Sequence, residues 1–207
     1  MKQPFSLTYV EYEKGDLLGF FLCLFSLLPN FLIVMYVTLI CSQRNLHTVF
    51  ALIGQLLNEV VNYILKYHMF SQKRPGGTDR QDPGMPSNHS QFIFFFCSYW
   101  IFYFLSEPRF QERIYTWLMI IAIAIGSATT CYSRLYLGYH TLEQVTAGIV
   151  FGVVCGIAWR LAYNYVFAHR LKSWQRHAFC RYVYLRDTSH IPNLLAYSYS
   201  KESSKLE

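Results

Sequence analysis

Five long apolar segments, separated by short polar stretches, restrict this chain to a helical fold inside a membrane. Each is close to the ~20 residues that a helix needs to cross ~30 Å of hydrocarbon, although the third is short. Because lipid offers no partner to unpaired backbone groups and no barrel-like alternation is present, all five are expected to be helices. The expected spans are Leu17–Ile40, Val49–Leu65, Ser90–Leu105, Ile114–Cys131 and Val145–Phe167.

The composition agrees with an all-α, polytopic membrane bundle of about five transmembrane helices. Of 207 residues, 53% are hydrophobic and only 14% are charged, which is too apolar for a soluble domain of this length. The net charge of +6 therefore does not indicate a soluble nucleic-acid-binding protein. We expect residues 1–168 to form the membrane domain and residues 169–207 to form a tail.

The basic residues gather on one side of the expected membrane. Five follow the last span before the first acidic residue, and three more fall on the same side in two other connections. Under the positive-inside rule this side is cytosolic, so an odd number of spans puts the N-terminus and the remaining polar loops in the lumen. These residues are Arg170, Lys172, Arg176, Arg181 and Arg186, then Arg44, Arg109 and Arg113.

A polar stripe runs along the second span. Asn58, Glu59, Asn62 and Lys66 recur at steps of three and four residues, so they share one face of a helix. Two interpretations stay open. The stripe is either a set of hydrogen bonds between helices, or a device by which Glu59 positions Lys66 near a site.

The loop that follows, residues 66–90, combines cations with a helix start. Its prolines and glycines bar a continuous helix, and Pro75 follows Lys73 and Arg74 directly. Ser87 stands where an N-cap belongs, so His89 falls in the first turn of the third span. A helix N-terminus near Lys and Arg is a typical anion site.

The second loop, residues 132–144, brings Arg134 and His140 to the junction of two spans. An arginine in hydrocarbon costs about 2.5–3.5 kcal/mol, and such groups usually face a bundle interior or an aqueous site. The simpler alternative is that Arg134 extends to the interface while His140 caps a helix. The two upstream stretches favour a shared site.

Together the lumenal stretches hold the parts for metal-free phosphoryl transfer, without a cofactor. Arg74 and Arg134 bind phosphate oxygens, and Lys66 or Lys73 adds charge. One histidine attacks phosphorus and the other donates a proton to the leaving oxygen. No acidic cluster is present to hold Mg²⁺, and the six cysteines lie in spans, at their ends or in the tail, so neither a disulfide nor a thiol metal site is expected.

These stretches resemble the motifs of the type 2 phosphatidic acid phosphatase superfamily. The superfamily pattern is Lys, six residues and Arg-Pro; then Pro-Ser-x-His; then Ser-Arg, five residues, His, three residues and Asp. Within it, the chain is similar to the dolichyldiphosphatases over roughly residues 7–195. The pieces that carry this similarity are Val10-Glu11-Tyr12, Leu57-Asn58-Glu59, Gly84-Met85-Pro86-Ser87, His89-Ser90-Gln91-Phe92, Tyr132-Ser133-Arg134, Tyr139-His140-Thr141 and Leu185-Arg186-Asp187-Thr188-Ser189.

The resemblance implies roles for individual residues. His140 is expected to be the nucleophile and His89 the acid and base. Arg74, Arg134, Ser87 and a lysine are expected to bind phosphate, with Asn88 beside them. The implied reaction is hydrolysis of dolichyl diphosphate to dolichyl phosphate and phosphate in the lumen of the endoplasmic reticulum, which recycles the glycan carrier lipid. Another lipid phosphate, such as phosphatidate or an isoprenyl diphosphate, or a catalytically silent lipid-binding scaffold, is the alternative.

The chain departs from the superfamily pattern at two positions. Seven residues, not six, separate Lys66 from Arg74, so either a local bulge restores Lys66 or Lys73 replaces it. Gln144 stands where the pattern has Asp. One helical turn after His140, its amide oxygen is placed to accept from Nδ1–H and fix the tautomer, without adding charge.

The remaining sequence features predict packing. The aromatic stretch 92–104 is expected to face lipid and other helices, and three glycines four residues apart in the last span favour close helix contact. Five histidines lack the setting of the two above and are expected to be solvated or to cap helices. They are His47, His68, His169, His177 and His190.

Overall fold

The computed structural model describes residues 10–70, 72–75, 83–107, 114–188, 191 and 194–204. Within these residues the chain is helical throughout, with no strand beyond one isolated bridge, so the predicted all-α fold is confirmed. The elements are α1 (Leu17–Ser26), α2 (Leu28–Gln43), α3 (Leu46–Ile64), η1 (Leu65–Phe70), α4 (Asn88–Ser106), α6 (Ile114–Tyr136), α7 (Leu142–Ala162), η2 (Tyr163–Phe167), α8 (Ala168–Trp174), α9 (Ala178–Tyr182) and α10 (Leu194–Ser203).

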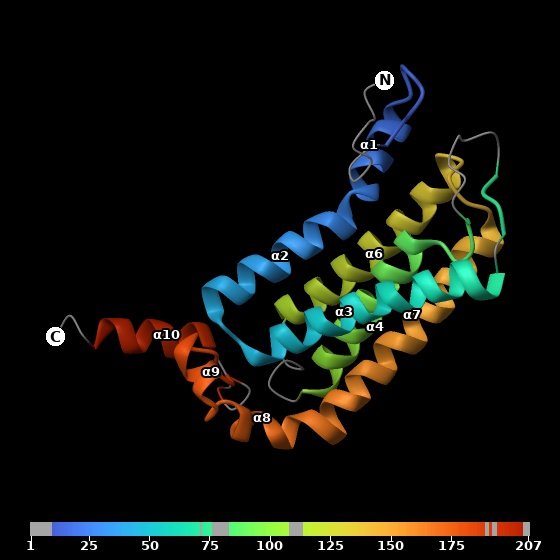
Figure 1. Cartoon of the computed structure of the whole chain (residues 1–207). Coiled ribbons are helices and arrows are strands. Elements are labelled where there is room, and N and C mark those ends of the chain that lie inside the picture. Colours follow the sequence, from blue (N-terminus) through green and yellow to red (C-terminus); the bar gives the residue numbers. More distant parts are fainter. Residues whose placement is uncertain are drawn as a thin grey trace, which may run out of the picture.

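Four helical stretches in the described residues are long and apolar enough to cross a membrane. They are residues 17–43, 46–70, 114–136 and 142–170. The fifth expected span, α4, is not one of them, because its first turn is polar. It lies against α2, α3, α6 and α7 in the middle of the bundle (Figure 1), where protein rather than lipid surrounds it.

The first span was expected to be one helix, but it breaks at Leu27. Pro29 has no N–H to donate to the carbonyl of Phe25, and its ring disfavours a continuous helix there. The hydroxyl of Thr130 on α6 shares its hydrogen between that carbonyl, at 3.2 Å, and the carbonyl of Gly126 on its own helix, at 2.8 Å. The break therefore follows from Pro29, and a hydroxyl from another helix satisfies the exposed backbone.

The aromatic stretch of α4 packs inside the bundle. Phe95, Phe96 and Tyr99 form a buried cluster with Tyr36 of α2. On the other side, α7 approaches α4 through its three glycines, where an added Cβ would meet α4 backbone atoms. These glycines are Gly148, Gly152 and Gly156, and their predicted packing role is confirmed. The close contact fixes how the start of α4 faces the start of α7.

His47 is neither solvated nor a cap, contrary to expectation. It is 5% exposed and stacks on Tyr103 with ring centroids 4.3 Å apart. Its Nε2 lies 3.0 Å from the hydroxyl of Tyr99. Aromatic rings from α4 and η2 supply this burial, which sequence spacing did not reveal.

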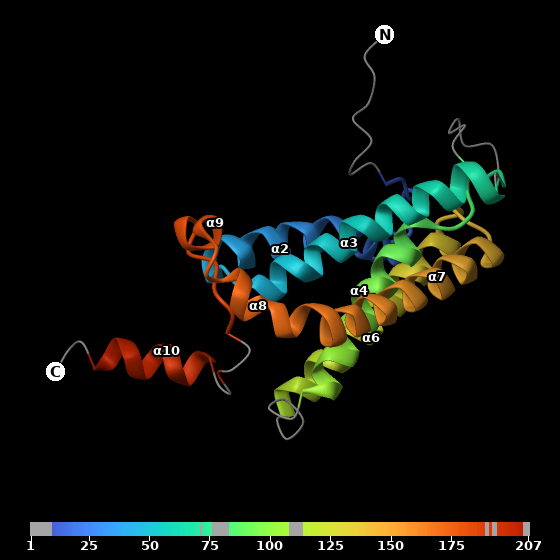
Figure 2. The ribbon, with the colours of Figure 1, turned by 60° about the horizontal axis from the view of Figure 1, so that its bottom comes forward.

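The tail continues α7 through a π-helical turn into α8 and then folds back to the α2–α3 connection. Arg186 forms an isolated backbone bridge with Asn45, and the side chain of Asn45 donates to the hydroxyl of Thr188 at 2.6 Å. Helix α10 extends away from the bundle in both views (Figures 1 and 2). Arg109, Arg113, His190 and residues 71, 76–82 and 205–207 of the expected loops and tail lie outside the described residues.

Candidate active site

Four chain segments meet at one end of the bundle, on the right in Figure 1. They are the end of α3 with η1, the start of α4, the end of α6, and the α6–α7 connection. The charges of Lys66, Arg74 and Arg134 act on both His89 and His140. The structure therefore brings the three motifs into one cluster, although they are far apart in the sequence.

The turn between α6 and α7 folds back so that the backbone of His140 contacts that of Arg134. Gly138 has φ +69°, a left-handed conformation that suits glycine. The backbone N–H groups of Tyr139 and His140 both donate to the carbonyl of Arg134, at 3.1 Å. This reversal accounts for the five residues that separate the arginine from the histidine.

Arg134 is held from two sides. Its Nη1 donates to the hydroxyl of Ser26 at 3.1 Å, and its guanidinium lies 4.2 Å from the ring centroid of Tyr139. The Tyr139 hydroxyl in turn accepts from the backbone N–H of Glu11 at 2.8 Å. The N-terminal stretch and the end of α1 thus position this arginine.

Sequence reasoning did not find Ser26. A proline three residues later in an apolar span was the available signal, because a broken helix exposes polar groups to neighbouring helices.

Gln144 contacts His140 directly, with Oε1 2.9 Å from Nδ1. The other end of the amide donates to the backbone carbonyl of Lys73 at 2.9 Å and to the side chain of Gln72 at 3.2 Å. A carbonyl oxygen only accepts, so the atom facing Lys73 is the amide nitrogen and the one facing His140 is the oxygen. Nδ1 of a neutral His140 must then carry the proton, which leaves a lone pair on Nε2.

His140 is neutral in this environment. It is 4% exposed, and burial lowers its pKa to about 3 against an ordinary value of 6.5. The nearby charges of Arg74, Arg134 and Lys66 lower the pKa further, and the hydrogen bond to Gln144 opposes them. An unprotonated imidazole is the form that can act as a nucleophile.

The two candidate lysines occupy different positions. Residues 65–70 form a π-helical segment, which takes more residues per turn than an α-helix and so absorbs the extra residue of the first motif. Lys66 is buried there, and its charge acts on Glu59 as well as on both histidines. The side chain of Lys73 is exposed, and its carbonyl supports Gln144.

The polar stripe of α3 divides into two parts. Asn58 and Asn62 bond to Gln91 of α4, at 3.0 and 2.8 Å, as helix-to-helix contacts. Glu59 bonds to the side chain of Asn88 and lies near Lys66. The helix-to-helix interpretation is confirmed for Asn58 and Asn62, and the positioning of Lys66 by Glu59 stays a prediction.

Ser87 is the N-cap residue of α4, as expected, but its hydroxyl makes no capping bond. It accepts from Ser90 at 3.1 Å, so its own hydrogen remains available to a ligand. Its backbone N–H donates to the carbonyl of Gln144 at 2.9 Å. The start of α4 is thereby tied to the start of α7.

The sequence pattern of the PAP2 superfamily matches residues 46–168, which include every motif of this cluster. The chain belongs to the PAP2 superfamily. Its similarity to other proteins of known sequence extends over almost the whole chain.

Three relatives illustrate this similarity. Dolichyldiphosphatase 1 of Rhinolophus ferrumequinum is 38% identical over 211 residues, which cover 96% of this chain and 87% of the relative. Dolichyldiphosphatase 1 of Dictyostelium discoideum is 34% identical over 206 residues, covering 97% and 90%. Lipid phosphate phosphatase gamma of Arabidopsis thaliana is 33% identical over 207 residues, covering 94% and 88%. No solved structure matches this PAP2 chain.

Proposed function

We propose that this chain is a lipid diphosphate phosphatase that hydrolyses dolichyl diphosphate to dolichyl phosphate and inorganic phosphate. The observation that carries the chemistry is the Gln144 amide, which holds a neutral His140 with its Nε2 lone pair free. The substrate follows from relatives named dolichyldiphosphatase that match 96–97% of the chain. The reaction would return the glycan carrier lipid for protein N-glycosylation.

In the first step, Nε2 of His140 attacks the terminal phosphorus. An N–P bond forms as the bridging P–O bond breaks. His89, which becomes protonated once the bound anionic diphosphate offsets the nearby cations, gives its proton to the departing dolichyl phosphate. In the second step, neutral His89 takes a proton from water, which attacks the phosphohistidine and releases phosphate. Dividing the reaction into two displacements makes each barrier lower than that of direct hydrolysis in one step.

The cations stabilise the phosphoryl group during both steps. Arg74 and Arg134 bind its oxygens as forks, and Lys66 adds a point charge. The Ser87 hydroxyl, the Asn88 amide and the first-turn N–H groups of α4 supply neutral donors. Lys73 contributes through its carbonyl, by orienting Gln144. Because three side-chain cations supply positive charge, the mechanism requires no metal ion.

The orientation in the membrane follows from charge. Residues 1–168 form the catalytic domain, and loops 66–90 and 132–144 open to the lumen of the endoplasmic reticulum. Arg44, Arg181 and Arg186 gather around a basic pocket at the other end of the bundle. The positive-inside rule assigns that end, with the tail 169–207, to the cytosol. An N-glycosylation acceptor added before residue 10 should be modified in cells, and one added after residue 204 should not.

Phosphate release from purified protein in detergent tests the function. Dolichyl diphosphate and phosphatidate are compared with EDTA present, using His140→Ala and, as a matched control, His169→Ala at an exposed position. We expect preference for the diphosphate, lost only in His140→Ala. A strict Mg²⁺ requirement would contradict the mechanism, preference for phosphatidate would reassign the substrate, and no release from either would leave a silent lipid-binding scaffold.

A further inference from the structure

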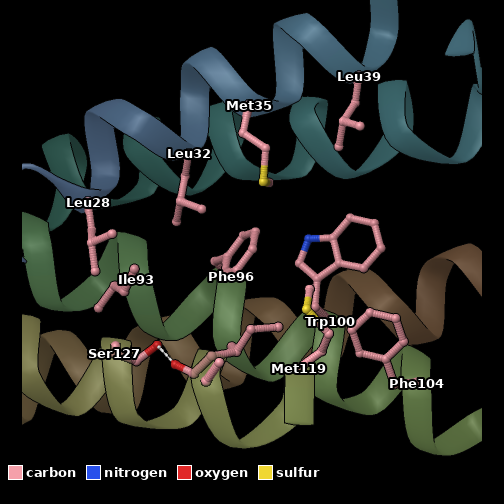
Figure 3. Close-up of a pocket in the computed structure, with 13 residues that line it drawn as sticks. Leu28, Leu32, Met35, Leu39, Ile93, Phe96, Trp100, Phe104, Met119 and Ser127 are labelled. Atoms are coloured by element: carbon pink, nitrogen blue, oxygen red, sulfur yellow. Dashed lines mark hydrogen bonds between the residues drawn. The ribbon is translucent and has the colours of Figure 1, made fainter. Parts of the chain in front are cut away.

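A cavity of about 350 Å³ lies between α2, α4 and α6 (Figure 3). Side chains from α2 point into it from one side, and those of α4 and α6 from the other. It is lined by Leu28, Leu32, Met35, Leu39, Ile93, Phe96, Trp100, Phe104, Met119, Ala122, Ile123, Gly126 and Ser127. Met119 is 52% exposed, so the groove opens along α6 to the surface that faces lipid.

The polar side chains of the groove have already used their donors. The Ser127 hydroxyl donates to the carbonyl of Ile123 at 2.7 Å (Figure 3). The indole N–H of Trp100 donates to the hydroxyl of Tyr36, also at 2.7 Å. The lining therefore offers hydrocarbon contact and no available side-chain N–H or O–H, which suits an apolar chain and disfavours one that carries polar atoms.

The groove begins next to the candidate active site. Ile93 follows His89 by one helical turn on α4, and Leu28 lies two residues after Ser26, which accepts from Arg134. From Ile93 to Phe104 the groove follows α4 for about 16 Å, at 1.5 Å per residue. A lipid whose phosphate binds at Arg134 would thus have this groove directly below its headgroup.

We propose that this groove holds the first isoprene units of the dolichyl tail and makes the enzyme selective for single-chain isoprenoid diphosphates. The inference rests on the proposed function and extends it to the recognition of the tail. The branched methyl groups of an isoprenoid suit a wall of aromatic and aliphatic side chains.

Phosphatidate fits the groove less well. It carries two tails, whereas the groove follows one path between α2 and the α4–α6 pair. Its ester carbonyls, close to the phosphate, would enter the upper end of the groove, where Leu28 and Ile93 offer no donor.

Two substitutions on the same helix test the groove. Ala122 and Ala124 are both exposed on α6, but only Ala122 lines the groove. The Ala122→Phe and Ala124→Phe proteins are compared in mixed micelles on dolichyl diphosphate and on geranyl diphosphate, which is too short to fill the groove. We expect Ala122→Phe to raise KM for the long substrate by about tenfold, with little change for the short one. Ala124→Phe should match the unsubstituted protein on both.

Gly126→Leu provides a second variant should Ala122→Phe fail to fold. A Cβ at this position would meet Leu28 at 3.6 Å, an ordinary contact, so the added side chain enters the groove without meeting backbone. Equal kinetics of the groove and control variants on dolichyl diphosphate, with normal activity of the unsubstituted protein, would overturn the groove assignment alone. Failure of the unsubstituted protein to hydrolyse dolichyl diphosphate would instead overturn the proposed function, and the groove assignment with it.

Discussion

Both ends of this bundle bury an arginine and a histidine, but the residues that contact them differ. At the candidate active site these are Arg134 and His140, and at the opposite end they are Arg160 and His47. All four side chains are at most 5% exposed. Burial alone therefore does not distinguish a site of catalysis from a structural cluster.

The contacts make the distinction. Arg160 pairs with Glu107 at 3.3 Å and lies over the rings of Tyr103 and Tyr163. Arg134, like Arg160, donates to a serine hydroxyl and lies over a tyrosine ring, but its charge acts on two histidines. A carboxylate balances the first arginine, whereas the second helps to build a positive cluster suited to an anion.

The histidines differ in the same way. His47 is enclosed by the rings of Tyr103 and Tyr163, and one of its ring nitrogens contacts Tyr99. His140 has Nδ1 held by the Gln144 amide, which leaves a lone pair on Nε2. We therefore expect the contacts of each histidine, more than its burial, to distinguish a catalytic residue from a structural one.

The largest difference between the two ends should appear on removing each histidine. His140→Ala should reduce turnover of dolichyl diphosphate by roughly 10⁴-fold or more, because no nucleophile remains. His47→Ala should lower thermal stability in detergent but keep most activity per folded molecule. Comparable loss of specific activity in both variants would contradict the distinction between a catalytic His140 and a structural His47.

The next largest difference should appear between the two arginine variants. Arg134→Ala is expected to lower kcat/KM by about 10²–10³-fold, since a donor to the developing charge is lost. Arg160→Ala should instead lower unfolding free energy by about 2–3 kcal/mol, less than a fully buried pair because Glu107 is 30% exposed. Steady-state kinetics and thermal unfolding of both variants measure the two effects. Loss of activity from Arg160→Ala without loss of stability would argue against a structural role.

Acidification should weaken the active-site end through His140. Because its pKa falls from 6.5 to about 3 on folding, the unfolded chain binds more protons between these values, and stability decreases as pH falls through that window. At pH 5 the loss relative to pH 7 should be roughly 2 kcal/mol. His140→Gln should flatten this slope in detergent unfolding, whereas His169→Gln should not. An unchanged slope in His140→Gln would assign the pH dependence to other groups.

The smallest effect is expected from Gln144→Asp. A carboxylate beside His140 favours imidazolium and raises its pKa, while contact with the Lys73 carbonyl changes from a hydrogen bond to repulsion. We expect a folded enzyme with about tenfold lower activity and an acidic limb moved to higher pH. The kcat/KM profile from pH 5 to 9 measures this. Rates identical to the unsubstituted protein at every pH would mean that Gln144 does not orient His140.

Much of this architecture could be predicted from local patterns. Apolar length indicated the spans, and the four-residue step from His140 to Gln144 anticipated their proximity, because both features depend only on helical geometry. The break at Leu27 also has a local cause, Pro29. Its consequence for the active site could not be predicted from local patterns. Only the packed bundle shows that the break brings Ser26 to Arg134.

The choice between Lys66 and Lys73 illustrates what local patterns left open. Their spacing to Arg74 allowed either a bulge or a substitute, and the π-helical segment at residues 65–70 turns Lys66 inward. The burial of His47 was likewise hidden, since its neighbours come from α4 and η2, more than fifty residues away in the chain. The catalytic roles of the individual residues stay predictions until the variants are measured.

The sequence by itself determined the helical membrane fold and the family, and it predicted the residues that we expect to carry phosphoryl chemistry. These follow from hydropathy, helix periodicity and short motifs, all of which act over a few residues. Tertiary structure alone decided which of the two lysines is buried, which hydroxyl holds Arg134, and where an apolar groove begins. Each of these depends on contacts between helices that are distant in the chain, and such contacts exist only once the helices are packed.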